Sequence, residues 1–186
     1  MNIKHYNNNV QLDKAIIKDI FSYFKNNPKF LMFGCGHDTK MWAAGNKNTY
    51  FVEDNLQYIN LAKQSVPEEN LIQVNYQTKV NSSEQMTDEE IRNHPIPNKI
   101  IKEAPFDIVL VDGPVGWGGG PGRLMPCYWA KMFTKEGSMV YVDDSERSLE
   151  SYAINKFFKD KNMIVNKDKD CNKTANHVAE CTKIFI

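Results

Sequence analysis

The order of apolar and polar residues along the chain shows two patterns, one typical of amphipathic helices and one typical of buried strands. Apolar residues at helical spacing from Val10 to Phe24 predict an amphipathic helix that ends before Pro28. We expect this N-terminal part, residues 1–27, to cover one face of a sheet. Continuous apolar runs bounded by charged residues, Gly or Pro predict buried strands. The expected strands are Phe30–Phe33, Thr49–Val52, Leu71–Tyr76, Ile108–Val111 and Ser138–Val142.

Helical spacing returns between these strands. The expected helices are Asp38–Ala44, Leu56–Ser65, Leu124–Phe133 and Leu149–Phe158. The polar stretch Gln77–Lys99 is the most loop-like region, with a short helix expected at Thr87–Arg92. Met163–Val165 and Lys183–Ile186 predict an antiparallel pair of strands at the sheet edge. Strands that alternate with helices indicate an α/β fold, a doubly wound and mostly parallel sheet in one domain spanning residues 1–186.

Composition and charge narrow the classes of partner. The chain has 186 residues, of which 23 are basic and 23 are acidic. Because these charges cancel, no positive field is available for a nucleic-acid backbone, and we expect no nucleic-acid partner. The first residues lack the apolar core of a signal peptide, and no apolar run is long enough to span a bilayer. We therefore expect a cytoplasmic protein without a membrane partner; the sequence does not indicate its oligomeric state.

The four cysteines, Cys35, Cys127, Cys171 and Cys181, have no CxxC spacing. A chain of this size needs no disulfides to hold its core, so we expect reduced thiols. The alternative is a disulfide between Cys171 and Cys181.

A small-residue turn, Gly34-Cys-Gly36, follows the first expected strand and opens a helix. Small residues let a ligand approach the backbone there, and the helix N-terminus offers free N–H groups. The alternative is a tight strand-to-helix turn in which Asp38 or Thr39 caps the helix. His37, next to the turn, is expected at the cofactor and is a reserve candidate for a general base.

Two acidic residues, Glu53 and Asp54, end the second expected strand. Nucleotide-binding sheets place an acid here to accept hydrogen bonds from ribose hydroxyls. Both dinucleotides and S-adenosylmethionine (SAM) contain adenosine, so this position fits either cofactor. The alternative is a solvated acid that caps the next helix.

Three more carboxylates, Asp112, Asp143 and Asp144, end two expected neighbouring strands. Oxygen ligands that converge at one sheet edge suit a divalent cation such as Mg²⁺ or Mn²⁺. A cation bound to a substrate hydroxyl lowers the pKa of that hydroxyl. The alternative is that Asp144 only caps the following helix.

The glycine-rich loop 113–122 follows Asp112, and no Lys-Ser/Thr pair follows it, so it is not a phosphate loop. Trp117 could stack on a sugar face, and Arg123 could hold a carboxylate through paired hydrogen bonds. Alternatively, Trp117 closes the loop onto the core and Arg123 pairs with the acidic cluster.

Several motifs occur together in the order seen in a known family. They are Phe33–Trp42, Phe51–Asp54, Tyr76–Lys79, Val111–Trp117, Pro121–Met125 and Val142–Arg147. In these motifs, over roughly residues 28–160, the chain resembles the polysaccharide-biosynthesis methyltransferase family. That family includes the plant glucuronoxylan 4-O-methyltransferases and the irregular-xylem proteins.

The resemblance implies a Rossmann-like SAM-dependent methyltransferase fold and methyl transfer to a sugar hydroxyl, with glucuronic acid as the best-known acceptor of the family. It places Gly34, Gly36 and Glu53 at SAM and Asp112 beside the reacting methyl group, and Arg123 could meet an acidic sugar. The plant proteins have histidine at the place of Asp143. The Asp143-Asp144 pair is instead similar to the metal-binding turn of catechol-type O-methyltransferases.

The leading hypothesis is a SAM-dependent O-methyltransferase that acts on a sugar or glycan acceptor with the help of a divalent cation. A nicotinamide-dependent oxidoreductase is the first alternative, although no third glycine completes its fingerprint after Gly36. A non-catalytic module that binds SAM or a glycan is the second.

Overall fold

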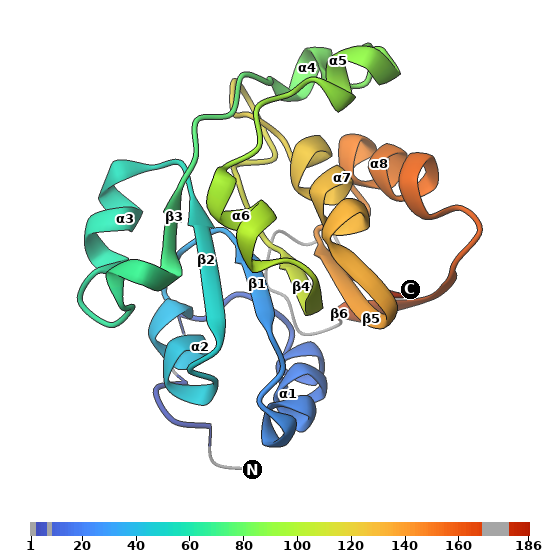
Figure 1. The fold of residues 1–186 in the computed structure, drawn as a ribbon. Helices are drawn as coiled ribbons and strands as arrows, with labels where there is room; N and C mark the ends of the chain where they lie inside the picture. The colour runs from blue at the N-terminus through green and yellow to red at the C-terminus, as the bar shows by residue number, and fades with distance from the viewer. Residues whose placement is uncertain (1–2, 7–8, 169–178) are drawn as a thin grey trace.

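The computed structural model describes residues 3–6, 9–168 and 179–186 (Figure 1). Seven strands form one sheet in the order β3-β2-β1-β4-β5-β7-β6. Strands β1 to β5 are parallel to one another, and β7 runs antiparallel to both β5 and β6. Both the doubly wound α/β prediction and the antiparallel C-terminal edge are confirmed. The strands are β1 (Phe30–Phe33), β2 (Thr49–Glu53), β3 (Leu71–Gln73), β4 (Phe106–Val111), β5 (Thr134–Asp143), β6 (Asn162–Asp168) and β7 (Ala179–Phe185).

Helices cover both faces of the sheet. They are α1 (Lys14–Tyr23), α2 (Thr39–Gly45), α3 (Leu56–Ala62), α4 (Val80–Ser83), α5 (Asp88–Arg92), α6 (Asn98–Glu103), α7 (Leu124–Phe133) and α8 (Ser148–Phe158). Side chains alternate between the faces along β1: Phe30 and Met32 pack with α1 and α2, whereas Leu31 and Phe33 pack with α7 and α8. The central strands β1 and β4 are therefore buried on both sides, as their continuous apolar runs predict.

The parallel register aligns the carboxyl ends of four strands. Phe33 at the end of β1 is opposite Val52 in β2 and Val111 in β4, and Val111 is opposite Val142 in β5. The residues that follow these positions therefore lie at one edge of the sheet. This edge carries the candidate site.

The N-terminal helix is shorter than its apolar pattern predicts. Asp13 caps α1 by accepting a hydrogen bond from the amide of Ala15, so the helix begins at Lys14. A 3-10 turn, Phe24–Asn26, continues it and ends at Asn27 in the left-handed conformation. The helix still covers the sheet as expected, with its apolar face buried.

The polar stretch Gln77–Lys99 contains more structure than expected, because α4, α5 and the start of α6 all fall within it. The predicted helix at Thr87–Arg92 is present as α5. Thr87 and Glu90 form a capping box: the Thr87 hydroxyl accepts from the Glu90 amide at 3.2 Å, and the Glu90 carboxylate accepts from the Thr87 amide at 2.7 Å.

Three cysteines, Cys35, Cys127 and Cys181, are buried free thiols. Cys171, and with it the alternative of a disulfide to Cys181, lies outside the described residues. Within the described ranges, the helices are all too short or too polar to cross a bilayer.

Candidate functional site

One cavity of about 640 Å³ lies at the carboxyl edge of the parallel strands. Its size is that of a small-molecule site. Every candidate residue of the sequence analysis lines it: Gly34, Gly36, His37, Glu53, Asp54, Asp112, Trp117, Arg123, Asp143 and Asp144. The individual roles expected for these residues stay predictions, but the structure brings all of them to one place.

The turn after β1 has the geometry that its glycines predict. Gly34 has a φ of 101°, a conformation that favours glycine. The amide of Gly36 donates to the Thr39 hydroxyl at 2.8 Å. His37, which follows the turn, is exposed and lines the cavity.

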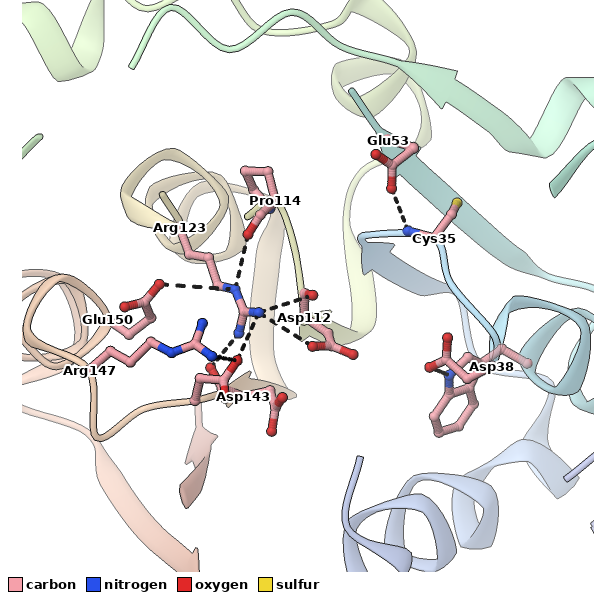
Figure 2. Close-up of polar contacts among 11 residues, drawn as sticks. Cys35, Asp38, Glu53, Asp112, Pro114, Arg123, Asp143, Arg147 and Glu150 are labelled. Atoms are coloured by element: carbon pink, nitrogen blue, oxygen red, sulfur yellow. Dashed lines mark hydrogen bonds and ion pairs between the residues drawn. The ribbon is translucent and has the colours of Figure 1, made fainter. Parts of the chain in front are cut away.

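Glu53 holds the ends of β1 and β2 together (Figure 2). Its Oε2 accepts from the amide of Cys35 at 2.6 Å, and its Oε1 accepts from the amides of Asp54 and Asn55 at 3.0 and 2.7 Å. Burial raises the pKa of Glu53, although these backbone hydrogen bonds oppose the shift. Glu53 is thus a rigid, buried acceptor in the cavity wall, and it is not the solvated helix cap of the alternative, because Asn55 caps α3 through its own side chain.

Asp38 is a buried acid of the cavity that the sequence analysis considered only as a helix cap. Its carboxylate accepts from the indole N–H of Trp42 in α2 at 2.7 Å and does not cap the helix by accepting from one of its backbone amides. Burial raises its pKa. The i,i+4 spacing of Asp38 and Trp42 is the sequence signal for this contact.

The three carboxylates Asp112, Asp143 and Asp144 meet as expected, with one oxygen from each within 4.8 Å of the others. Burial raises the pKa of Asp112 to about 6, against the opposing effect of the Arg123 guanidinium. Burial, followed by the neighbouring Asp112, raises the pKa of Asp143 well above its usual value. The cluster is therefore a set of desolvated acids that repel one another.

Arg123 is the buried cation of this cluster, with only 3% of its surface exposed. One guanidinium nitrogen lies 3.0 Å from Asp144 Oδ2 and 3.5 Å from Asp112 Oδ1 (Figure 2). The guanidinium also donates to the backbone carbonyls of Asp143 at 2.6 Å, Asp112 at 3.2 Å and Pro114 at 3.3 Å. Arg123 thus pairs with the acidic cluster, which is the alternative considered for it, and it fastens the loop to the ends of β4 and β5.

Two further charged residues complete the cluster: Arg147, which the sequence suggests as a stabiliser of the Asp143-Asp144 turn, and Glu150, which was not expected there. Glu150 in α8 is fully buried, and its carboxylate lies 4.0 Å from Arg123. Arg147 lies 2.8 Å from Asp144 Oδ2. Glu150 lies on the inner side of α8, so helical spacing is the signal that could have found it.

The glycine-rich loop presents Trp117 to solvent, with 63% of its surface exposed. This exposure excludes the alternative that Trp117 closes the loop onto the core. The guanidinium of Arg147 lies over the indole ring, 5.2 Å from its centre. The loop backbone comes so near to α8 that a Cβ on Gly116 would lie 2.7 Å from Glu150 Oε1.

Solved structures share this fold at low sequence identity. An O-methyltransferase from Bacillus cereus in complex with SAH superimposes with a TM-score of 0.56 at 12% identity, over 98% of this chain and 84% of that one. Precorrin-6y C5,15-methyltransferase from Geobacter metallireducens gives a TM-score of 0.55 at 10% identity, over 98% and 94%. The fold is therefore the Rossmann-like fold of SAM-dependent methyltransferases.

Curated plant proteins are more similar in sequence. Glucuronoxylan 4-O-methyltransferase 3 of Arabidopsis thaliana is 31% identical over 65% of this chain and 48% of its own length. Protein IRX15-LIKE of the same plant is 28% identical over 74% of this chain and 52% of its own. The chain thus spans about half the length of these two relatives. The sequence profile of the IRX15/IRX15L/GXM family matches residues 14–172, which is most of the chain, and this protein therefore belongs to that family.

Proposed function

We propose that this protein is a SAM-dependent O-methyltransferase that methylates a hydroxyl of a sugar or glycan. The observation that carries the proposal is that one cavity brings the Gly34 turn and Glu53 together with the Asp112 cluster. Such a cavity can hold a cofactor and an acceptor side by side, and alignment of the two reactants is the main requirement of methyl transfer. The fold and the relatives named for glucuronoxylan 4-O-methylation support it.

The cofactor side of the cavity suits an adenosine-containing ligand. When bound, SAM supplies a methyl group made electrophilic by its sulfonium. Gly36 leaves the backbone open to a ligand, Gly34 lets the turn pack against Gly113, and the second lone pair of Glu53 Oε2 is available to a ribose hydroxyl. Asp54 and His37 line the same part of the cavity.

The acceptor side of the cavity needs a group that takes a proton. When the sugar oxygen bonds to the methyl carbon, the hydroxyl proton must leave, and Asp112 is the main candidate to accept it. A carboxylate whose pKa is raised to about 6 is a better base than an ordinary one while still ionised near pH 7. His37 is the second candidate, and Trp117 offers an exposed ring for the sugar face.

The cluster of Asp112, Asp143 and Asp144 fits a divalent cation in its donor chemistry, since hard oxygen ligands suit Mg²⁺ or Mn²⁺. In the metal-assisted form of this proposal the three carboxylates would hold the cation, which would lower the pKa of the acceptor hydroxyl, and His37 rather than Asp112 would then take the proton. Arg123 already supplies one positive charge to the same carboxylates. The requirement for a metal is therefore tested separately from methyl transfer.

The decisive experiment incubates the purified protein with methyl-labelled SAM and glucuronic-acid-bearing xylo-oligosaccharides. We expect labelled sugar, and a loss of roughly 100-fold or more in kcat for Asp112→Asn if Asp112 is the base. Calorimetry with S-adenosylhomocysteine and with NAD distinguishes the methyltransferase from a nicotinamide enzyme. Binding of S-adenosylhomocysteine without methylation of any glycan would instead indicate a binding module.

The metal is tested by treating the same reaction with EDTA and adding back Mg²⁺ or Mn²⁺. The cation site would be supported if EDTA abolished the activity of the wild type and added Mg²⁺ or Mn²⁺ restored it, while the activity of Asp143→Asn did not respond to the metal. Full activity in EDTA would leave Arg123 as the cation of the cluster and remove the metal from the mechanism.

A further inference from the structure

Asp38 is a buried acid of the cavity that the proposed reaction does not use. It lines the cavity, and 7% of its surface is exposed. Its Oδ2 accepts from the indole N–H of Trp42, which holds the carboxylate in place. Its Oδ1 lies beside the open backbone of Gly36, where a Cβ would be 3.4 Å from it. The protein therefore binds one oxygen of this carboxylate, and the other lies at a turn that is open to a ligand.

The charge of Asp38 has no ion-pair partner within the part of the chain that the structure describes. Burial raises its pKa. The two arginines of the cavity wall, Arg123 and Arg147, both pair with Asp144. Figure 2 shows Asp38 and Arg123 on opposite sides of Asp112. A positively charged group of a bound ligand would therefore supply the counterion that the chain itself does not provide.

The segment before α1 forms another wall of this cavity. Residues 9–11 line it, and Val10 packs against the apolar cluster that contains Trp42. The segment therefore lies on the α1 and α2 side of the sheet, as Asp38 does, whereas the glycine-rich loop lies against α8 on the other side. Residues 9–11 also precede the stretch that the family profile matches, so this wall is not part of what identifies the family.

The cofactor of the proposed reaction carries a suitable positive group. SAM and S-adenosylhomocysteine both consist of adenosine joined through sulfur to an amino acid, whose amino group is protonated near pH 7. In the proposed function, Glu53 meets the ribose and Asp112 lies at the acceptor hydroxyl. The part of the cavity that remains for the amino acid is bounded by Asp38 and residues 9–11.

We propose that Asp38 binds the ammonium group of the amino-acid end of the cofactor, and that residues 9–11 form the wall that covers this end. Trp42 is then a positioning residue, since its indole N–H holds Oδ2 and leaves the lone pairs of Oδ1 to the ligand. This inference rests on the proposed function and adds a cofactor-binding residue to the same site.

The test compares two ligands that differ at the amino-acid end. S-adenosylhomocysteine contains this end, whereas 5′-methylthioadenosine has the same adenosine and sulfur without it. Calorimetry gives both dissociation constants for the wild type and for Asp38→Asn, which keeps an oxygen for Trp42 but has no charge. We expect the variant to bind S-adenosylhomocysteine roughly 10- to 100-fold more weakly, the value of a hydrogen bond between charged groups. Its affinity for 5′-methylthioadenosine should stay within about twofold of the wild type.

Two further variants serve as controls. Glu53→Gln should weaken both ligands, because both contain the ribose. Asp160→Asn, at an exposed position after α8, should weaken neither. Thermal melting verifies that each variant is folded. A comparison within the wild type needs no variant: decarboxylated S-adenosylhomocysteine, which retains the amine, should bind at least about tenfold more tightly than 5′-methylthioadenosine.

Hydrogen exchange followed by mass spectrometry tests the wall. With both ligands at saturation, the amides of residues 9–12 should exchange more slowly with S-adenosylhomocysteine than with 5′-methylthioadenosine, and equal exchange would remove this segment from the subsite. Equal changes in affinity for the two ligands in Asp38→Asn, or no change for either, would overturn the role of Asp38. Failure of the wild type to bind S-adenosylhomocysteine at all would instead contradict the proposed function.

Discussion

The backbones of Gly34 and Gly113 touch where β1 and β4 end. A Cβ on Gly113 would lie 2.6 Å from the Cα of Gly34, and a Cβ on Gly34 would lie 3.0 Å from the Cα of Gly113. Both contacts involve backbone atoms, which cannot move aside as the end of a side chain can. The two loops that form the centre of the site therefore meet only because neither residue has a side chain.

This contact predicts that Gly113→Ala lowers the free energy of unfolding by about 1–3 kcal/mol, because the added methyl group forces the two strand ends apart. Gly119→Ala in the same loop is the matched control, since its Cβ would meet no atom within 4 Å. We expect the control to change stability by less than about 0.5 kcal/mol. Urea denaturation measures both, and equal stability of the two variants would contradict the contact.

Replacing Arg123 by Met should destabilise the protein by about 3–5 kcal/mol, because buried carboxylates lose their cation. Arg123→Lys should recover only part of this loss, since one ammonium group cannot replace the guanidinium, which pairs with Asp144 and donates hydrogen bonds to three backbone carbonyls. Arg92→Met, at an exposed position of α5, is the control. Thermal melting and urea denaturation measure the effect, and a stable Arg123→Met protein would show that the acids do not need the guanidinium.

Glu53→Gln should weaken binding of S-adenosylhomocysteine by roughly 10- to 100-fold, which is the value of one or two hydrogen bonds to a charged group. The amide keeps the shape of the side chain but holds the amides of Cys35, Asp54 and Asn55 less strongly. Glu69→Gln, on the exposed surface, is the matched control. Calorimetry gives both dissociation constants, and an unchanged value for Glu53→Gln would remove Glu53 from the cofactor site.

Trp117→Ala should raise KM for the glycan acceptor by about tenfold, or about 1.4 kcal/mol, and change kcat little. The ring is exposed, so stability should change by less than about 0.5 kcal/mol. Trp117→Phe keeps an aromatic face and should restore most of the affinity. Steady-state kinetics on the three proteins decides the question, and equal KM values would exclude stacking on the acceptor.

The thiols of Cys35, Cys127 and Cys181 should resist iodoacetamide in the folded protein. All three are buried, and burial raises the pKa of each thiol, so little thiolate forms near neutral pH. Peptide mass spectrometry before and after denaturation in urea measures the labelling of each cysteine. Rapid labelling of Cys35 in the native protein would show that the turn after β1 opens.

The sequence predicts the sheet well because burial on both faces produces continuous apolar runs, such as Ile108–Val111. It predicts the neighbourhood of Glu53 and Asp112 equally well, since parallel strands align their carboxyl ends. It does not predict which acids are paired. Arg123 is far from Asp144 and Glu150 in the sequence, so no local pattern indicates that they pair. Their contact depends on how α7 and α8 pack on the sheet. Helices α4 and α6 escaped prediction for a similar reason, since they bury few apolar side chains.

The loop that carries Trp117 is anchored at both ends and exposed in its middle. Arg123 ties its end to buried carboxylates, and Gly113 at its start packs against Gly34, whereas Trp117, Gly118 and Gly119 face solvent. If Trp117 contacts the acceptor as proposed, substitutions in this exposed stretch would alter which acceptor is recognised at little cost to the stability of the domain. Within a family, this division would let acceptor preference diverge quickly while the reacting centre stays the same.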